Sequence, residues 1–278
     1  MCRFFFFLNG QHQSRLSFKL WKFRELKHPL VSSQFLFSHE VAKLAIQVPN
    51  RAMIIMAHPD DPEFFCGGTI ALWCAGGAEV TYLILTNGNK GSDDPAMTPE
   101  KLVAVRREEQ QAAADVLGVK RVLFFDEPDG ELQPTLSLRK RIVAEIRRYQ
   151  PDIVIAPDPT RYFYLNTYIN HADHRAAGEA AIDAVFPAAR NRMYHPELLI
   201  DGLEPHTVKE IYLSGSLHPD RWVDISDVLE TKLKAIRCHT SQVKDPEAMV
   251  KRVTDRHKAI DAYGREVLHE EFNVIVIG

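Results

Sequence analysis

The chain has 278 residues, of which 45% are hydrophobic and 26% are charged, a composition typical of a soluble globular protein. Its 34 Lys and Arg residues nearly balance its 37 Asp and Glu residues, and this balance argues against a nucleic-acid-binding protein. No apolar run reaches the roughly 18 residues that a membrane-spanning helix needs. The 4 cysteines form no Cys-x-x-Cys pair, so we expect reduced thiols in a cytoplasmic protein.

The first 48 residues show no clean hydrophobic periodicity. Their short apolar run, Phe4 to Leu8, lacks the length and the small-residue cleavage site of a signal peptide. A docking arm, a disordered leader and sequence upstream of the true start all stay open for this stretch. We therefore expect an N-terminal extension over residues 1–48 and a single domain over residues 49–278.

From residue 52 onward, strand and helix patterns alternate. Met53–Ala57 is a short continuous apolar run, which is typical of a strand buried on both faces. The pattern then predicts, in chain order, a helix over Thr69–Ala75, a strand over Glu79–Thr86, a loop over Asn87–Ala96, a helix over Thr98–Leu117, a strand over Val122–Phe125, a helix over Leu136–Tyr149 and a strand over Ile153–Ala156. Beyond residue 187 it predicts strands near 208–213 and 222–225 and helices near 226–238 and 246–262.

This alternation predicts an α/β fold with right-handed crossovers. The sheet should be mostly parallel and Rossmann-like, flanked by helices, with a smaller and less regular C-terminal α+β portion. Sheets of this kind place their binding sites at the carboxyl ends of the strands. A dinucleotide-binding dehydrogenase is rejected, because no Gly-x-Gly-x-x-Gly follows the first strand.

Two clusters of polar residues follow strands of this predicted sheet. After the first strand, the segment AHPDDPE (57–63) contains one imidazole and two aspartates within four residues. It could be a surface turn, but its two prolines and its place at a strand end favour a functional site. The loop after the fourth strand leads to His171, Asp173 and His174. A plain helix start with Asp173 near the helix dipole is the alternative for this second cluster.

Two histidines and one aspartate from these clusters would form a metal site with one position left for water. Three protein ligands and an open position are typical of catalytic rather than structural zinc. Zinc lowers the pKa of bound water to about 7 and so supplies hydroxide at neutral pH. The same ligand set also binds non-haem iron, so another divalent transition metal stays possible.

Several motifs together resemble the PIG-L/LmbE-like metal-dependent de-N-acetylases, many of which act on molecules that contain N-acetylglucosamine. These motifs are AHPDDPE (57–63), GGTIA (67–71), VRREE (105–109), LGV (117–119), PDGEL (128–132) and HADH (171–174). The resemblance spans residues 52–186. Residues 223–242 resemble the diacetylchitobiose deacetylases more weakly. The resemblance implies a single de-N-acetylase domain over residues 49–278.

The resemblance also implies the roles of six residues at the metal. The zinc ligands would be His58, Asp61 and His174. Asp60 would be the general base that activates water. His171 would act on the tetrahedral intermediate, and Asp173 would orient a histidine.

Two further residues are implied to contact the substrate. Arg106 would do so directly, although it could instead pair with Glu109 or contact Gln110 on a helix surface. Asp129 would hydrogen-bond sugar hydroxyls, although it could merely form the turn before Gly130.

The chain also departs from the family pattern. The long segment before His58 is unusual for the family, and Pro62 separates Glu63 from the two aspartates, so Glu63 receives no role. The loop Pro157–Asn170 is rich in aromatic residues. It could stack on a sugar or simply pack on the surface, and both alternatives stay open.

The sequence thus predicts zinc-dependent hydrolysis of the N-acetyl group of a small N-acetylglucosamine-containing substrate, which releases acetate and a free amine. The alternative is a catalytically silent sugar- or nucleotide-binding protein on the same fold. The resemblance further implies a homo-trimer or homo-hexamer. A disaccharide, a malate or inositol conjugate and a lipid-linked sugar all stay open as substrates.

Overall fold

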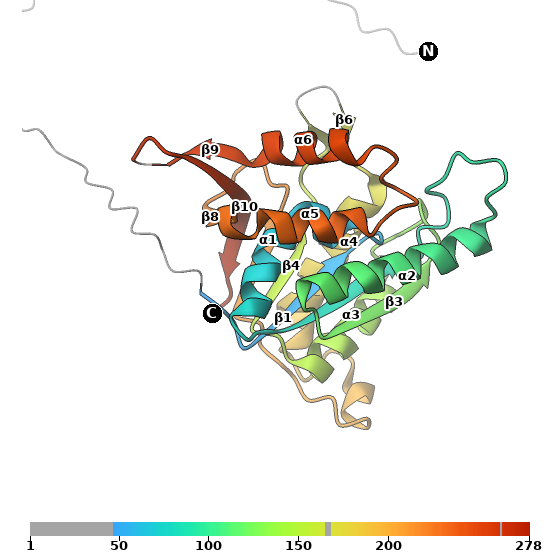
Figure 1. Ribbon diagram of the computed structural model, residues 1–278. Helices are drawn as coiled ribbons and strands as arrows, with labels where there is room; N and C mark the ends of the chain where they lie inside the picture. Colours follow the sequence, from blue (N-terminus) through green and yellow to red (C-terminus); the bar gives the residue numbers. More distant parts are fainter. Residues whose placement is uncertain (1–46, 165–167, 262) are drawn as a thin grey trace, which may run out of the picture. The chain divides into compact units, whose positions relative to one another are not determined.

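The computed structural model describes residues 47–164, 168–261 and 263–278. Residues 1–46 of the expected N-terminal extension lie outside the described residues, so that expectation stays a prediction. Within the described residues, eight strands form one sheet with the order β3-β2-β1-β4-β7-β10-β8, and β9 pairs with β10 (Figure 1).

The elements of the fold have the following bounds. The strands of the main sheet are β1 (Arg51–Met56), β2 (Glu79–Thr86), β3 (Arg121–Glu127), β4 (Ile153–Pro157), β7 (Glu210–Ser214), β8 (Arg221–Asp224), β9 (Lys258–Ile260) and β10 (Glu266–Val276). A separate hairpin consists of β5 (Phe163–Tyr164) and β6 (Tyr168–Ile169). The α-helices are α1 (Asp61–Ala75), α2 (Pro99–Leu117), α3 (Leu136–Tyr149), α4 (Ala172–Asp183), α5 (Leu229–Arg237) and α6 (Pro246–His257). Short helical turns are η1 (Ala184–Ala189), η2 (Pro196–Leu199) and η3 (Ser226–Val228).

The predicted α/β fold is confirmed, and its strand order has a reversal at β1. Strands β3, β2, β1, β4 and β7 pair in parallel, whereas β10 is antiparallel to both β7 and β8. The chain moves from β1 outward through β2 to β3, and then returns to the other side of β1 to form β4. At such a reversal the carboxyl ends of neighbouring strands open a crevice for ligands.

Both faces of β1 are buried, as its continuous apolar run predicted. Alternate side chains of a strand point to opposite faces of the sheet. Ile54 and Met56 therefore pack in a core with α1, α2 and α5, whereas Met53 and Ile55 pack in a second core with α3 and α4. The two helix layers hold the end of β1 rigidly, and the first polar cluster begins there.

Helix α2 begins and ends where the sequence predicts. The Thr98 hydroxyl accepts a hydrogen bond from the Lys101 backbone N–H at 3.3 Å, and Pro99 occupies the first helical position. Gly118 ends the helix with a φ of 81°, a left-handed conformation that suits glycine.

Helix α1 starts at Asp61 and not at the predicted Thr69, so that boundary is wrong. The helix is kinked at Cys66, whose φ is −146° and ψ is 19°. Beyond the kink, the Glu270 carboxylate accepts hydrogen bonds from the backbone N–H groups of Gly68 at 2.8 Å and Thr69 at 2.7 Å. A residue about 200 positions away thus caps the second half of the helix, and no local pattern could predict it.

The predicted C-terminal elements need two corrections. Helix α6 ends at His257, whereas the pattern extended it to residue 262. Strand β10 was not predicted at all, although it is the central antiparallel strand of the C-terminal portion. The alternation of polar and apolar residues along this strand is broken by Glu270, which is fully buried and pairs with Lys232 at 2.6 Å. A charged residue in the sequence predicts an exposed position, so the pattern of this strand could not be recognised.

Two smaller expectations can be compared with the structure. Cys66, Cys74 and Cys238 are free thiols, as expected. Among the described residues, no helix has both the length and the apolar character required to cross a membrane.

Candidate metal centre

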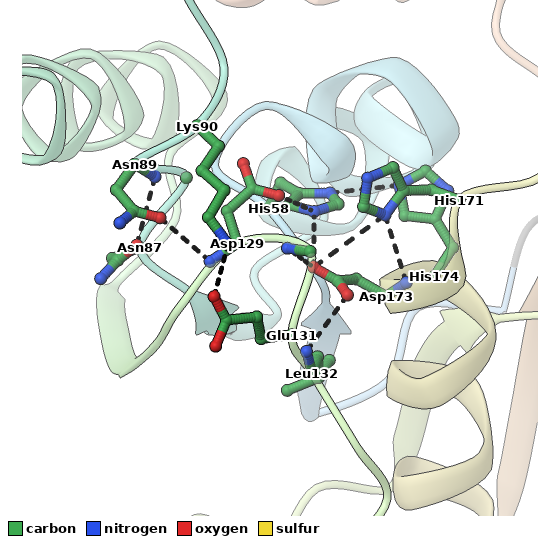
Figure 2. A network of polar contacts seen from close by, with 12 residues as sticks. His58, Asn87, Asn89, Lys90, Asp129, Glu131, Leu132, His171, Asp173 and His174 are labelled. Carbon is green, nitrogen blue, oxygen red and sulfur yellow. Dashed lines mark hydrogen bonds and ion pairs between the residues drawn. The ribbon is translucent and has the colours of Figure 1, made fainter. Parts of the chain in front are cut away.

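The two polar clusters meet at the carboxyl ends of β1 and β4, on either side of the strand-order reversal. His58 follows β1, and Asp61 begins α1. His174 lies in the first turn of α4, which follows β4 and the β5–β6 hairpin. Figure 2 shows the imidazoles of His58, His171 and His174 gathered in this place.

Three residues in this cluster present nitrogen and carboxylate oxygen atoms to one another at similar distances. His58 Nδ1 is 3.3 Å from His174 Nε2 and 3.4 Å from Asp61 Oδ2, and His174 Nε2 is 3.1 Å from Asp61 Oδ1. Tetrahedral donors about 2.0–2.1 Å from a zinc ion are about 3.3 Å apart. The three residues therefore fit the first coordination sphere of one small divalent cation.

On each imidazole ring, the nitrogen that points away from the other ring makes a hydrogen bond. The second nitrogen of each ring therefore faces the other ring. His174 Nδ1 lies 3.1 Å from Asn170 Oδ1, and His58 Nε2 lies 3.2 Å from Asp173 Oδ2. In a neutral ring, each of these nitrogens carries the proton that it donates to the oxygen, so His174 Nε2 and His58 Nδ1 are the nitrogens left to bind a metal ion. The sequence analysis gave Asn170 no role. Its position four residues before His174 is the feature that could have indicated this contact.

Asp173 is fully buried and makes several hydrogen bonds at once. It accepts from the backbone N–H groups of Gly130 at 2.6 Å and Leu132 at 3.2 Å, in addition to His58 (Figure 2). Burial raises the pKa of Asp173, but the hydrogen bonds from His58 and Gly130 lower it below its usual value. The position of Asp173 suits the predicted role of orienting a histidine, and that role stays a prediction.

Asp129 and His171 complete a second layer around His58. Asp129 Oδ1 lies 3.2 Å from His58 Nε2, and the His171 ring stands edge-on to the His58 ring with centroids 4.7 Å apart. His58, Asp129, His171 and Asp173 also lie close enough to suggest a second metal group. Both groups would need His58, however, and its Nε2 already donates a proton when Nδ1 faces the first group. We therefore assign these residues to the support of His58.

The carboxylates concentrate negative charge around His58. Burial alone would lower the pKa of His58, but hydrogen bonds to Asp129, Asp173 and Asp61 raise it well above its usual value. Burial raises the pKa of Asp61, yet the charge and hydrogen bonds of His174 and His58 hold it well below its usual value. A divalent cation at this place would neutralise the excess negative charge.

Asp60 stands beside this group in an unusual backbone conformation. Its φ is 99°, in the region that glycine favours, and its carboxylate lies 3.2 Å from the Arg106 guanidinium. Burial raises the pKa of Asp60 to about 6, and the neighbouring Arg106 opposes this rise. At neutral pH the carboxylate is ionised and can accept a proton.

The comparisons with known proteins agree with this geometry. The family model PIG-L, described as GlcNAc-PI de-N-acetylase, matches residues 53–185. The diacetylchitobiose deacetylase of Thermococcus kodakarensis is 40% identical over 192 residues, which are 69% of this chain and 70% of the relative. The chain belongs to the PIG-L family. The PIG-L de-N-acetylases are metal-dependent, and the His/Asp cluster of this member suits a metal ion.

Two further similar proteins extend the comparison. A solved structure of the N,N'-diacetylchitobiose deacetylase from Pyrococcus horikoshii has a TM-score of 0.73 and 32% identity, over 82% of this chain and 84% of that chain. The 4-oxalmesaconate hydratase of Pseudomonas putida is 30% identical over 205 residues, which are 69% of this chain and 73% of the relative. Proteins similar to this chain therefore include some named as deacetylases and one named as a hydratase.

In this PIG-L protein, Arg106 is buried against the loop of Asp60. It donates to the carbonyl oxygens of Gly88, at 3.2 Å, and of Pro59, in addition to its contact with Asp60. The alternative of a surface pair with Glu109 does not form between these two described residues, because the Glu109 carboxylate accepts from Thr240 and Ser241 instead. The predicted contact of Arg106 with the substrate stays a prediction.

The aromatic loop forms the β5–β6 hairpin that leads into His174. Tyr162, Phe163 and Tyr168 are each more than half exposed, at 55%, 59% and 58%. Arg161 anchors the hairpin by donating to the Gly215 carbonyl oxygen at 2.8 Å. The Arg175 guanidinium lies over the Tyr162 ring, 4.4 Å from its centroid. Stacking of the exposed rings on a sugar is still one of the two alternatives for this loop.

Proposed function

We propose that this protein binds a zinc ion and hydrolyses the N-acetyl group of a small substrate that contains N-acetylglucosamine. The reaction consumes water and releases acetate and a free amine. The observation that carries the proposal is the group of His58, Asp61 and His174, whose facing nitrogen and carboxylate oxygen atoms are 3.1–3.4 Å apart, with each Asp61 oxygen facing one ring. Membership of the PIG-L family supports the choice of reaction.

His58, Asp61 and His174 would hold the metal. Two nitrogens and one carboxylate oxygen suit zinc best among common ions, although iron accepts the same set. A bound zinc ion would polarise the amide carbonyl and lower the pKa of water. Asp173, Asp129 and Asn170 would hold the two imidazoles in the required tautomers.

Asp60 and His171 would move the protons of the reaction. Asp60 is ionised at neutral pH and would take a proton from the attacking water. His171 Nδ1 accepts a hydrogen bond from the Asp173 backbone N–H at 3.2 Å, so its Nε2 carries the proton. That N–H would stabilise the oxyanion of the tetrahedral intermediate, and the proton taken up by Asp60 would pass to the amine nitrogen as its bond to the acetyl carbon breaks.

Substrate recognition is proposed for Asp129 and the β5–β6 hairpin. The Asp129 carboxylate is at the edge of the His58 cluster and would accept hydrogen bonds from sugar hydroxyls. The exposed rings of the hairpin would stack on the sugar next to the acetylated one. Arg106 has its terminal nitrogens on protein acceptors, which supports a role in holding Asp60 alongside any contact with the substrate.

The test is acetate release by the purified protein loaded with zinc. The panel contains diacetylchitobiose, as named for one relative, and the malate and inositol conjugates of N-acetylglucosamine, as named for others. We expect release of acetate from at least one of them, and roughly 100-fold to 10,000-fold less with Asp60→Asn. Metal content measured by mass spectrometry should be the same for both proteins.

Two other outcomes would contradict the proposal. Bound metal without turnover of any panel member would favour the alternative of a silent sugar- or nucleotide-binding protein. Addition of water to 4-oxalmesaconate without acetate release would favour the chemistry named for the Pseudomonas putida relative. The cytoplasmic location and the homo-trimer or homo-hexamer stay predictions, and gel filtration with light scattering tests the latter.

A further inference from the structure

A chain of buried polar side chains lies behind Asp60, outside the metal centre. Gln110 Oε1 accepts a hydrogen bond from the Asp60 backbone N–H at 2.8 Å, and Gln110 Nε2 donates to both oxygens of Glu63 at 3.1 Å. His239 Nε2 lies 3.1 Å from Glu63 Oε2. Gln110, Glu63 and His239 have no exposed surface, so solvent does not satisfy them. Each of these side chains therefore depends on its neighbours in the series for its hydrogen bonds.

One peptide unit, between Pro59 and Asp60, is held at both of its polar ends. Arg106 donates to the Pro59 carbonyl oxygen, and Gln110 accepts from the Asp60 N–H. Arg106 and Gln110 are four residues apart on α2, so they project from the same face of the helix. Together they determine the plane of this peptide unit.

The peptide unit needs such support because Asp60 is strained. A non-glycine residue rarely adopts a φ of 99°, and such a conformation persists only where its surroundings impose it. Without the two side chains of α2, the backbone could relax and turn the Asp60 carboxylate away. The conformation of the proposed base is therefore decided by α2 as well as by its own loop.

Glu63 decides which way the Gln110 amide points. A glutamine amide can present either its oxygen or its NH₂ group to Asp60, and only the oxygen can accept the Asp60 N–H. The carboxylate of Glu63 accepts but does not donate, so it holds the NH₂ group on its own side. His239, from the segment after α5, in turn holds Glu63.

We propose that Gln110 and Glu63 are positioning residues for Asp60, with His239 as the anchor of Glu63. The proposal rests on the proposed function, since it takes Asp60 as the base. It assigns a role to Glu63, which received none from the sequence. The neighbours of His239, Thr240 and Ser241, bind Glu109 of α2, so the segment after α5 is also held against the helix that carries Gln110.

The first test replaces Gln110 by a side chain of similar size without hydrogen bonds. In Gln110→Met, we expect kcat to fall roughly 10-fold to 100-fold, because the base is displaced. KM and bound zinc should stay within about twofold of the wild type, because Gln110 contacts neither substrate nor ligands. The matched control is Gln111→Met, which alters an exposed neighbour bonded only to Asp115 and should leave kcat unchanged.

The second test exchanges the charges of the pair. Gln110→Glu alone places two carboxylates against each other, and we expect a loss of kcat similar to that of Gln110→Met. Adding Glu63→Gln supplies an amide that donates to the new carboxylate, which then accepts the Asp60 N–H. We expect this double variant to recover kcat to within about threefold of the wild type. A role limited to filling space would give no such recovery.

The outcomes separate the two proposals. Wild-type kcat in Gln110→Met, or no recovery in a double variant with wild-type melting temperature and zinc content, would overturn the positioning role. If the wild type deacetylates nothing, the proposed function fails, and the crystal structure of Gln110→Met then decides the positioning role. Departure of Asp60 from positive φ supports it, and an unchanged φ overturns it. If Gln110→Met does not fold, the charge exchange decides alone.

Discussion

His58 Nδ1 lies 3.3 Å from His174 Nε2, although 116 positions separate the two residues in the chain. Both nitrogens present lone pairs, since the other nitrogen of each ring donates to Asp173 or Asn170. Two lone pairs and the Asp61 carboxylate directed at one point repel one another unless a cation joins them. This relationship is the basis of the first two predictions.

Loss of a proposed ligand should remove the metal. We expect His174→Ala to retain little zinc and to lose activity more than 100-fold, because two donors hold the ion far less tightly than three. Zinc per chain after dialysis, measured by mass spectrometry, checks this. His195→Asn is the control, since His195 precedes η2 and asparagine tolerates its φ of 54°. Full zinc occupancy in His174→Ala would remove His174 from the ligand set.

Loss of the hydrogen bond between His174 and Asn170 should weaken metal binding without removing a ligand. Asn170→Ala leaves His174 Nδ1 without its acceptor, so both tautomers become accessible. We expect zinc affinity to fall roughly 10-fold to 100-fold, as measured by competition with a chelator. Asn191→Ala, which alters an exposed asparagine bonded to the Met193 N–H, should keep wild-type affinity. Equal affinities for both variants would contradict the role of Asn170.

Activity should decline in acid as Asp60 takes up a proton. Burial raises the pKa of Asp60 to about 6, and the base must be ionised to work. We therefore expect kcat/KM to fall about tenfold per pH unit below that pKa. A bound divalent cation opposes this rise and lowers the pKa of Asp60, so the decline in activity should begin at or below pH 6. A pH profile on the zinc-loaded protein checks this, and a decline that begins at pH 7 or above would contradict it.

Stability should also fall in acid, through His257. Its Nε2 lies 2.9 Å from Lys232 Nζ, which donates to it, and its Nδ1 donates to the His269 carbonyl oxygen at 2.7 Å. Burial and the charge of Lys232 lower the pKa of His257 from 6.5 to about 4. The unfolded chain thus takes up the proton first, and stability present above pH 6.5 is lost as the pH falls toward 4, by up to about 3 kcal/mol.

Urea unfolding at pH 7.5 and pH 5 measures this loss. His257→Gln keeps an acceptor for Lys232 and a donor for His269, but it has no proton to gain. We expect the variant to lose less stability than the wild type between the two pH values. An equal loss in both proteins would show that other groups cause the acid sensitivity.

Some parts of the fold and of the site could be predicted because their signals are local. The continuous apolar run of β1, the cap at Thr98 and the glycine after α2 depend on neighbours in the chain. The same is true of the AHPDDPE and HADH motifs, which carry the resemblance to the family and, through it, the proposed ligands. Their place after strands of a parallel sheet follows from the alternation of elements.

The errors and omissions occur where a distant residue decides the local structure. Glu270 is buried within β10, so the sequence missed that strand. The same carboxylate caps α1 beyond its kink, at the place where the sequence set the start of the whole helix. Glu63 looked unused because its partners, Gln110 and His239, come from α2 and from the segment after α5.

The sequence by itself predicted the family, the alternation of strands and helices, and the residues that we propose to carry the chemistry. Only the tertiary structure decided which nitrogen of each imidazole faces the metal position and which side chains hold Asp60 in its strained conformation. The physical reason is that residue type and periodicity are properties of the local chain. Hydrogen-bond direction and burial, in contrast, depend on groups that only folding brings within about 3 Å.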